Sequence, residues 1–359
     1  MEKTSPMPDS EATAPKTRAG NTVTVIISPR DRYTGVVECI EELYRCTPVQ
    51  AFELVALDLG YPAAIRKALE KALSDKDNAK IVSYGRIIPI EGVRRYREFI
   101  DSPFTVLLDN DSRVTPGWLQ PLLETADNTN AAVINPLTLE KSGVDEGAEL
   151  RNHLYINEIR VVEAEGQARL IEHKPYRRAS PEEIPMEVRP TQAFELHCVL
   201  FRTSVLKDIE LPQMTIREHL DIGMQLKARG ETLYADPRSV IHFDNLGTRA
   251  ALSDLLYFNL RWNGKVTHQS SRLFEKRWGY RFYSEESIYN WAIRRRLFLL
   301  LRWLHLPIFL ANKVDRVFFA VRRRLFPIWD PLKDPIGSSE LLYETLSNSK
   351  PDQLSHDIF

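Results

Sequence analysis

Two aspartates, Asp109 and Asp111, stand two residues apart directly after the apolar run Phe104–Leu108. A short run of aliphatic and β-branched residues is typical of a strand that is buried on both faces. Open α/β sheets bind their ligands beyond the carboxyl ends of such strands. Two carboxylates there repel each other unless a cation lies between them, and a hard divalent cation that shares its ligands with phosphates fits best. The pair therefore predicts a metal site, although residues 109–112 are also typical of a simple turn.

The aspartate pair belongs to a repeating pattern of apolar runs and helical stretches. The runs that we predict as strands cover residues 23–28, 52–57, 80–84, 104–109 and 131–134. Apolar residues at helical spacing separate these runs, which indicates a parallel sheet with right-handed crossovers. The second run ends in Asp58, so more than one acid is expected at the carboxyl edge of the sheet.

The first predicted strand leads into Ser28-Pro29-Arg30 and not into a glycine-rich loop. Neither a Gly-x-Gly-x-x-Gly motif nor a Walker-type Gly-Lys-Ser/Thr motif follows it. Phosphates would therefore be held by something other than a glycine cradle, and a metal on Asp109 and Asp111 would serve. The same absence argues against a nucleotidyltransferase, which shares a metal and a Rossmann-like sheet but usually carries a glycine-rich loop with a basic residue.

Composition excludes several classes of protein. Of the 359 residues, 43% are hydrophobic and 27% are charged, as in an ordinary globular protein with one large domain or two modest ones. A net charge of −1 argues against a nucleic-acid binder. The three cysteines show no Cys-x-x-Cys spacing, which fits a reducing cytosol. Residues 1–20 lack the apolar core of a secretion signal, so we expect a disordered tail and a cytoplasmic protein.

The second half of the pattern adds further candidate residues. Residues 158–172 read as a hairpin within an insertion at 140–190, and residues 194–201 read as another strand. Glu218, His219 and Asp221 cluster in the first turn of a helical stretch, where acids are favoured by the helix dipole. A short strand then ends at His242, which by itself is typical of a core histidine.

Taken in order, these motifs resemble the family 2 glycosyltransferases over roughly residues 22–245. No single motif is specific, and the resemblance depends on the whole series at the expected spacing. The matching segments are Ser28-Pro29-Arg30, the strand ending in Asp58, Leu107–Asp111 as the Asp-x-Asp motif, Glu195–Arg202, Glu218–Asp221 and Asp236–His242.

The resemblance implies a single Rossmann-like, mixed-sheet α/β domain of the A-type glycosyltransferase fold at residues 21–250. It also implies a nucleoside-diphosphate sugar donor and Mn²⁺ or Mg²⁺ as cofactor. In that picture Asp111 coordinates the metal, and Asp109 reaches the ribose or sugar of the donor and also counts as a metal residue. His242 resembles the third metal ligand, while Asp58 and the Pro29-Arg30 turn face the base and ribose.

The sequence departs from the family pattern in two places. The usual base is the second residue of Glu-Asp, where this chain has His219, and an imidazole with a pKa near ~6.5 can also accept a proton at neutral pH. Glu218 or Asp221 are the alternatives for the base. Upstream of the Asp109 strand, a run containing Arg94, Arg95 and Arg97 replaces a small-residue run. These arginines either bind the diphosphate bidentately or form a solvated helix face.

Residues 251–330 are predicted as a basic, amphipathic helical extension, followed by a loose tail at 331–359. Between Ile288 and Trp329 the only acid is Asp315, and arginines alternate with Leu, Phe and Trp. The longest apolar stretch is too short and too charged to cross a bilayer, which takes about 20 apolar residues. Residues 286–330 fit an anionic membrane surface, and packing on the catalytic domain or in a homodimer is the alternative.

The leading hypothesis is a metal-dependent, inverting glycosyltransferase that moves a sugar from a nucleoside-diphosphate donor to a saccharide or a lipid-linked acceptor. Because His219 replaces the usual carboxylate, the first alternative is a catalytically silent relative that binds nucleotide sugar or polysaccharide as a scaffold.

Overall fold

The computed structural model describes residues 23–141, 148–164, 167–244, 250–262, 264–282, 285–325 and 339–341. The tail expected at 1–20 lies outside the described residues, as does most of the tail expected at 331–359. The exception is β14 (Ser339–Leu341), which pairs antiparallel with β8 of the hairpin.

The main sheet is mixed, as expected, and its strands follow the order β10-β12-β6-β11-β4-β1-β2-β3. Strands β1, β2, β3 and β4 run parallel to one another, whereas β11 pairs antiparallel with both β4 and β6. The strands are β1 (Val23–Ser28), β2 (Phe52–Asp58), β3 (Ala79–Ser83), β4 (Phe104–Asp109), β5 (Ser112–Val114), β6 (Val133–Lys141), β7 (Leu150–Leu154), β10 (Arg189–Pro190), β11 (Cys198–Arg202) and β12 (Leu233–Phe243). This arrangement confirms a Rossmann-like α/β sheet.

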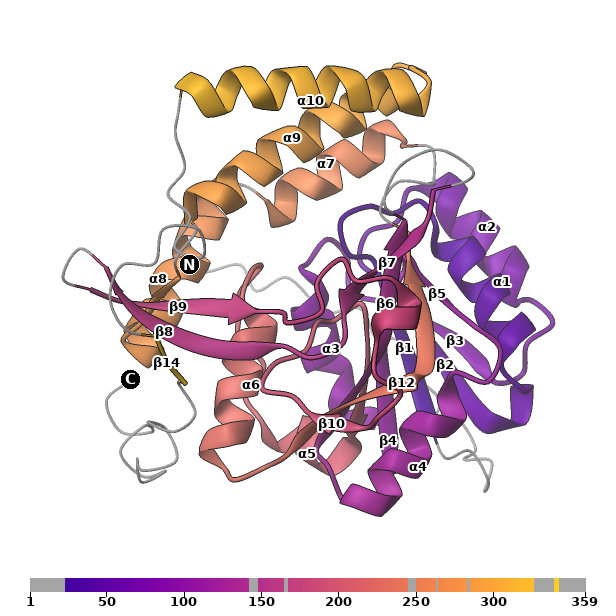
Figure 1. Cartoon of the computed structure of the whole chain (residues 1–359). Helices are drawn as coiled ribbons and strands as arrows, with labels where there is room; N and C mark the ends of the chain where they lie inside the picture. The colour runs from indigo at the N-terminus through magenta and orange to yellow at the C-terminus, as the bar shows by residue number, and fades with distance from the viewer. Residues whose placement is uncertain are drawn as a thin grey trace, which may run out of the picture.

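Helices cover both faces of the sheet because its strands are apolar on both faces (Figure 1). Val25 and Ile27 of β1 pack toward one face and Ile26 toward the other, as strand alternation requires. The first face is covered by α1 (Val36–Cys46), α2 (Ala63–Leu73) and α4 (Leu119–Thr129), and the second by α3 (Pro89–Tyr96), α5 (Thr203–Asp208) and α6 (Glu218–Ala228). The sheet is therefore buried, and its free carboxyl edge is left for a site.

A second, small sheet forms at the predicted hairpin. Strands β8 (Glu158–Ala164) and β9 (Gln167–His173) pair antiparallel, and β13 (Arg281–Phe282) adds to β9. Ile159 and Leu170 from the hairpin pack against Leu220 and Met224 of α6 and against Phe274. The hairpin is thereby held beside the first turn of α6.

Within the described part of the chain, four helices follow the sheet, and they confirm the predicted helical extension. They are α7 (Leu252–Arg261), α8 (Gly264–Trp278), α9 (Glu285–Trp303) and α10 (Ile308–Leu325). Figure 1 shows α10 across the top of the molecule, above α9 and on the side away from the sheet. Among the described residues, no helix is long and apolar enough to cross a membrane.

One predicted element differs from the structure. The strand predicted at 194–201 begins only at Cys198, although Phe194 and Leu196 are buried. The apolar pattern at these positions indicates burial but not strand pairing. A buried loop next to a strand has the same composition, so the pattern does not distinguish the two. The shift has a consequence for function, since His197 stands at the point where the pairing with β4 begins.

Candidate metal and donor site

The described residues bring Asp109, Asp111 and His197 together at the carboxyl end of β4. One ligand atom from each lies within 4.8 Å of the others, and all three residues are buried. His197 Nδ1 lies 3.4 Å from Asp109 Oδ2, and the His197 carbonyl accepts a hydrogen bond of 3.0 Å from the Asp109 amide. Because β11 runs antiparallel to β4, the residue before β11 faces the residue that ends β4.

Excess negative charge governs the electrostatics of this group. Burial and the charge of Asp109 raise the pKa of Asp111 to about 6. Burial alone would lower the pKa of His197, but the flanking carboxylates of Asp109 and Glu195 raise it to about 9. Both pKa shifts have the same cause, because the excess of carboxylates favours a positive charge within this group.

The group fits a divalent cation by two observations. Asp109 Oδ2 and Asp111 Oδ1 are buried, and neither makes a hydrogen bond within the part of the chain that the structure describes. Charged groups do lie near Asp109 Oδ2, with His197 Nδ1 at 3.4 Å and Arg30 Nε at 3.3 Å, but a buried carboxylate oxygen without a hydrogen bond is costly unless a ligand binds it. Two carboxylate oxygens and one imidazole nitrogen suit Mn²⁺ and similar ions of intermediate character.

The structure does not bring His242 into this group. In the ladder of β12, His242 pairs with Arg113 and Leu139, and the neighbouring Phe243 packs on the His197 ring at 4.0 Å between centroids. Strand alternation therefore directs His242 to the opposite side from Phe243. Burial lowers the pKa of His242, with Glu42 and Lys141 as the charged groups acting on it. His197 lies beside the acid pair, at the place where the resemblance leads us to expect His242.

Arg30 links the acid pair to α6. Its Nε lies 3.3 Å from Asp109 Oδ2, and its Nη1 donates to Glu218 Oε1 at 2.8 Å. Arg261 of α7 lies 3.3 Å from the same Glu218 oxygen and forms a close ion pair with Asp31. Burial alone would raise the pKa of Glu218, but the two guanidinium groups hold it below its ordinary value.

The other two candidates for the base lie in different surroundings. Asp221 is fully buried, accepts hydrogen bonds from Trp278 Nε1 at 2.8 Å and from Gln225 Nε2 at 2.7 Å, and lies 3.3 Å from Arg277 Nε. Burial raises the pKa of Asp221. These contacts anchor α8 to α6.

His219 faces the hairpin instead. Its Nε2 lies 3.4 Å from Glu172 Oε1, and neither ring nitrogen makes a hydrogen bond to a described residue.

The residues expected to contact the donor are spread over the same edge, with one exception. Asp58 accepts hydrogen bonds from the amides of Gly60 and Tyr61 at 3.0 and 2.8 Å and pairs with Arg66. The Pro29 carbonyl accepts from Tyr257 Oη at 3.0 Å. Arg94 is the exception, because its two bonds of 2.7 Å go to Glu91 on the partly exposed face of α3.

Three residues of the site escaped the sequence reasoning. His197 lay inside an apolar run and was read as an ordinary strand residue. Arg261 and Arg295 come from the helical extension, which was treated as separate from the site. Arg295 of α9 is buried, and burial and the charge of Arg32 lower its pKa to about 10, while Asp31, Asp111 and Asp244 act against that shift. Only the charge run around Arg295 gave a signal in the sequence.

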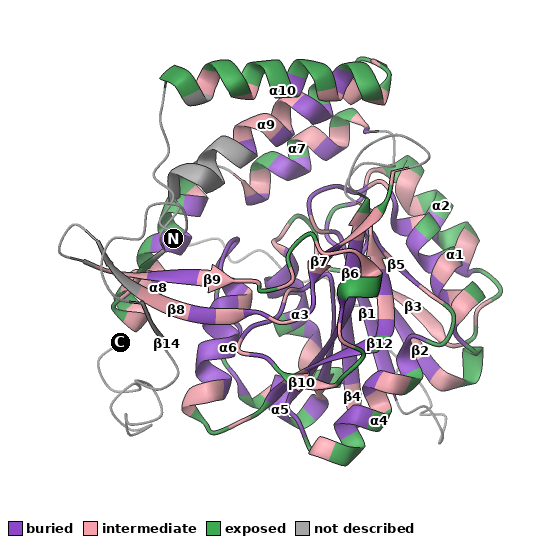
Figure 2. Ribbon diagram, viewed as in Figure 1, coloured by how far each residue is buried: buried purple, intermediate pink, exposed green. Residues whose placement is uncertain are grey.

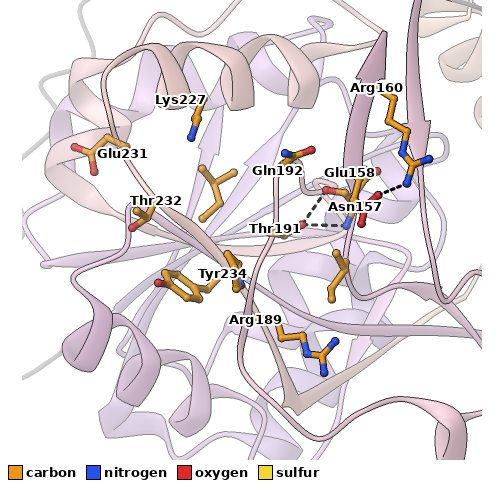
Figure 3. A pocket seen from close by; sticks show the side chains of 13 residues that line it. Asn157, Glu158, Arg160, Arg189, Thr191, Gln192, Lys227, Glu231, Thr232 and Tyr234 are labelled. Atoms are coloured by element: carbon orange, nitrogen blue, oxygen red, sulfur yellow. Dashed lines mark hydrogen bonds and ion pairs between the residues drawn. The ribbon is translucent and has the colours of Figure 1, made fainter. Parts of the chain in front are cut away.

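A cavity of about 700 Å³ lies apart from the acid pair (Figure 3). Polar residues from β8 and the residue before it, from β10 and from the start of β12 line it, including Asn157, Arg189 and Tyr234. The sheet register places Leu233 of this cavity, through β6 and β11, level with the start of β4 and not with its carboxyl end. The cavity therefore belongs to a different end of the sheet from Asp109.

No protein-family model matches the sequence, and no curated protein matches it. Among solved structures, the chain is similar to a crystal structure of GalNAc-T7 with UDP, GalNAc and Mn²⁺, at 13% sequence identity and a TM-score of 0.46. The similarity covers 62% of this chain and 43% of that chain. This chain thus matches less than half of the length of that protein.

Proposed function

We propose that the protein is a metal-dependent glycosyltransferase that uses a nucleoside-diphosphate sugar and inverts the configuration of the transferred sugar. The observation that carries the proposal is the buried group of Asp109, Asp111 and His197 at the carboxyl edge of a Rossmann-like sheet. The ordered motifs that resemble family 2 glycosyltransferases support the same reading.

In this proposal Asp109, Asp111 and His197 hold Mn²⁺ or Mg²⁺ against the donor diphosphate. When bound, the cation supplies Lewis-acid stabilisation of the charge that builds on the departing diphosphate. Arg30 keeps Asp109 in place, and Arg32 and Arg295 are the cations near Asp111 that would face the remaining phosphate oxygens. Asp58 and the Pro29-Arg30 turn remain our candidates for the nucleoside.

The reaction that these residues would perform is a single displacement. An acceptor hydroxyl oxygen forms a bond to the anomeric carbon, the bond from that carbon to the diphosphate breaks, and its electron pair leaves with the diphosphate. The hydroxyl proton must pass to a base within hydrogen-bond reach.

The contacts of the three candidates favour His219 as that base. Glu218 is held by two arginines with its pKa lowered, and Asp221 is committed to Trp278 and Gln225. Neither ring nitrogen of His219 makes a hydrogen bond to a described residue. The carboxylate of Glu172 lies 3.4 Å from Nε2 and would stabilise the imidazolium.

The acids are covered in this conformation, since Asp109 is 3% and Asp111 2% exposed. Donor binding therefore requires side chains above them to move. We propose that Arg32 and Arg295 move, because both lie on segments outside the sheet and carry the charge that a diphosphate attracts. The acceptor is a saccharide or a lipid-linked sugar.

The test is thermal stabilisation and donor hydrolysis with a panel of nucleotide sugars in the presence of Mn²⁺. We expect one donor to raise the melting temperature only with metal, and to be hydrolysed slowly without acceptor. Asp111→Ala should abolish both effects, whereas Asp101→Ala, at an exposed position before β4, should change neither. Equal responses of the two variants would overturn the proposal.

The second candidate is a catalytically silent relative that binds a nucleotide sugar or polysaccharide as a scaffold. Two observations favour it, namely the replacement of the usual carboxylate by His219 and the near-complete burial of the acid pair. It predicts metal-dependent donor binding with no hydrolysis and no transfer under any acceptor. The panel above separates the two candidates directly.

A further inference from the structure

We propose that helices α9 and α10 form a platform that docks the protein on an anionic lipid bilayer, with α10 lying flat in the headgroup region. This inference is separate from the proposed transferase activity, because lipid binding can be measured without any sugar donor. It starts from the outer face of α10.

The outer face of α10 is apolar and uncovered. Leu310, Val314, Val317 and Val321 are 39%, 37%, 60% and 53% exposed, and their spacing of four, three and four residues places them along one stripe of the helix. Phe309, at 64%, and Trp303, at 36%, extend this apolar surface around the turn from α9. Figure 2 shows α10 exposed along its upper side, where no other element of the described residues lies over it. We call this surface the α10 stripe.

Basic residues flank the α10 stripe on one side. Lys313, Arg316 and Arg324 are exposed, and at 100° per residue all three fall on the same side of the stripe. Arg316 and Arg324 also line a cavity of about 520 Å³ between the two helices, together with Arg294 and Phe319. A cavity lined by guanidinium groups suits a phosphate, because arginine binds phosphate oxygens bidentately.

The charge pattern distinguishes a membrane from a second copy of the chain. The only acid in α10 is Asp315, which is 6% exposed and turned inward, where Arg294 binds it at 3.1 Å. A second copy packed stripe to stripe would bring the same exposed cations together without an acid to pair with them. An anionic bilayer instead offers both an apolar interior for the stripe and negative charge for its flank.

The platform is also connected to the candidate site. Arg294 and Arg295 are neighbours on α9, and Arg294 points to α10 while Arg295 lies within the charge field of Asp31 and Asp111. Docking of α10 would therefore fix the orientation of the acid pair relative to the bilayer.

The experiment is flotation of the full chain with vesicles of phosphatidylcholine alone and with added phosphatidylglycerol. We expect flotation only with the anionic vesicles, and a decrease as salt is raised. Val317→Glu/Val321→Glu should reduce partitioning at least about tenfold, because two buried apolar side chains become charged. Arg316→Glu/Arg324→Glu should also reduce it by about tenfold or more, since each cation near the surface contributes to binding.

Matched controls carry the same substitutions elsewhere on the exposed surface. Val49→Glu/Met186→Glu changes two exposed apolar residues, at 50% and 64%, and Lys67→Glu/Lys71→Glu changes two exposed cations on α2. Both controls should float like the unchanged protein, and circular dichroism should show all variants folded. Equal binding to neutral vesicles, or unchanged flotation of the α10 variants, would overturn the proposal. The proposal would also be overturned if the unchanged protein fails to float and instead forms a dimer in sedimentation equilibrium, and if Val317→Glu/Val321→Glu dissociates that dimer.

Discussion

The carboxylate of Asp109 and the imidazole of His197 are 3.4 Å apart, although 87 residues separate them along the chain. One residue ends β4 and the other precedes β11, and their backbones are hydrogen-bonded at the same place. The pairing explains why His197 and not His242 meets the acid pair. It also makes the candidate metal site a product of the antiparallel pairing of β11 with β4 in a mixed sheet.

This relationship predicts which histidine binds metal. His197→Gln should weaken Mn²⁺ binding by about 10–100-fold or more, because one of three protein ligands is lost. His242→Gln should leave the affinity within about twofold, because its ring lies on the other side of β12. Isothermal titration with MnCl₂ measures both. The reverse order of effects would restore His242 as the ligand and would exclude the group described here.

The double contact of Glu218 predicts a role in stability. Glu218→Gln leaves Arg30 and Arg261 buried with one carboxylate fewer, which should cost about 3 kcal/mol in the free energy of unfolding. The control is Glu42→Gln, which breaks an exposed pair with Arg45 on α1 and should cost less than about 1 kcal/mol. Urea unfolding at neutral pH measures both values. If Glu218→Gln is no more destabilising than the control, the contacts of Glu218 with Arg30 and Arg261 do not contribute to stability.

Arg295 should have opposite effects on the two ligands of the site. Arg295→Met removes a positive charge that acts on Asp111, so Mn²⁺ should bind about threefold more tightly. A nucleoside diphosphate should bind about tenfold more weakly, because the same charge no longer faces its phosphates. Arg316→Met, at an exposed position on α10, should change neither affinity. A parallel loss of both affinities would instead indicate general damage to the packing of α9.

Asp58 predicts a pH dependence of stability. Burial alone would raise its pKa, but the amides of Gly60 and Tyr61 and the Arg66 side chain hold it below its ordinary value. A carboxyl whose pKa is lower in the folded state stabilises the fold above the unfolded pKa of about 3.9, and this contribution is lost as pH falls through the folded value. Asp58→Asn should therefore cost about 1–3 kcal/mol at pH 7.

The difference between Asp58→Asn and the unchanged protein should shrink below about pH 4, because the unfolded chain takes up a proton at Asp58 there, whereas the folded carboxylate does so only at a lower pH. Urea midpoints at pH 7 and at pH 3.5 give the comparison. A difference that stays constant over this range would mean that the charge of Asp58 does not contribute, and that its hydrogen bonds alone explain the loss.

The role of His219 as the base can be tested through the rate of sugar transfer by variants of His219 and its neighbours. Once a donor and acceptor are known, His219→Ala should lower kcat by about 10²–10⁴-fold with little change in donor affinity. Glu172→Gln, which removes the carboxylate beside the ring, should lower kcat less, by about tenfold. If His219→Ala keeps full activity while Glu218→Gln is inactive and of normal stability, the base is Glu218 and not His219.

The sequence by itself determined the parts of the protein that depend on local pattern. The alternation of strands and helices could be predicted because residues such as Val25, Ile26 and Ile27 make both faces of a strand apolar. The Asp109 and Asp111 pair was readable because it directly follows such a strand. The basic amphipathic character of α10 was readable because helical spacing repeats every few residues.

Only the tertiary structure decided which distant side chains meet. Whether β11 runs parallel or antiparallel to β4 depends on how the whole sheet assembles, and that direction brings His197 to Asp109. In β12 a shift of one residue would exchange the sides of His242 and Phe243, so the register of β12 and not the residue type keeps His242 away from the acid pair. Arg261 reached Glu218 from a helix beyond the sheet, because burial of charge is balanced by partners close in space at any separation along the chain.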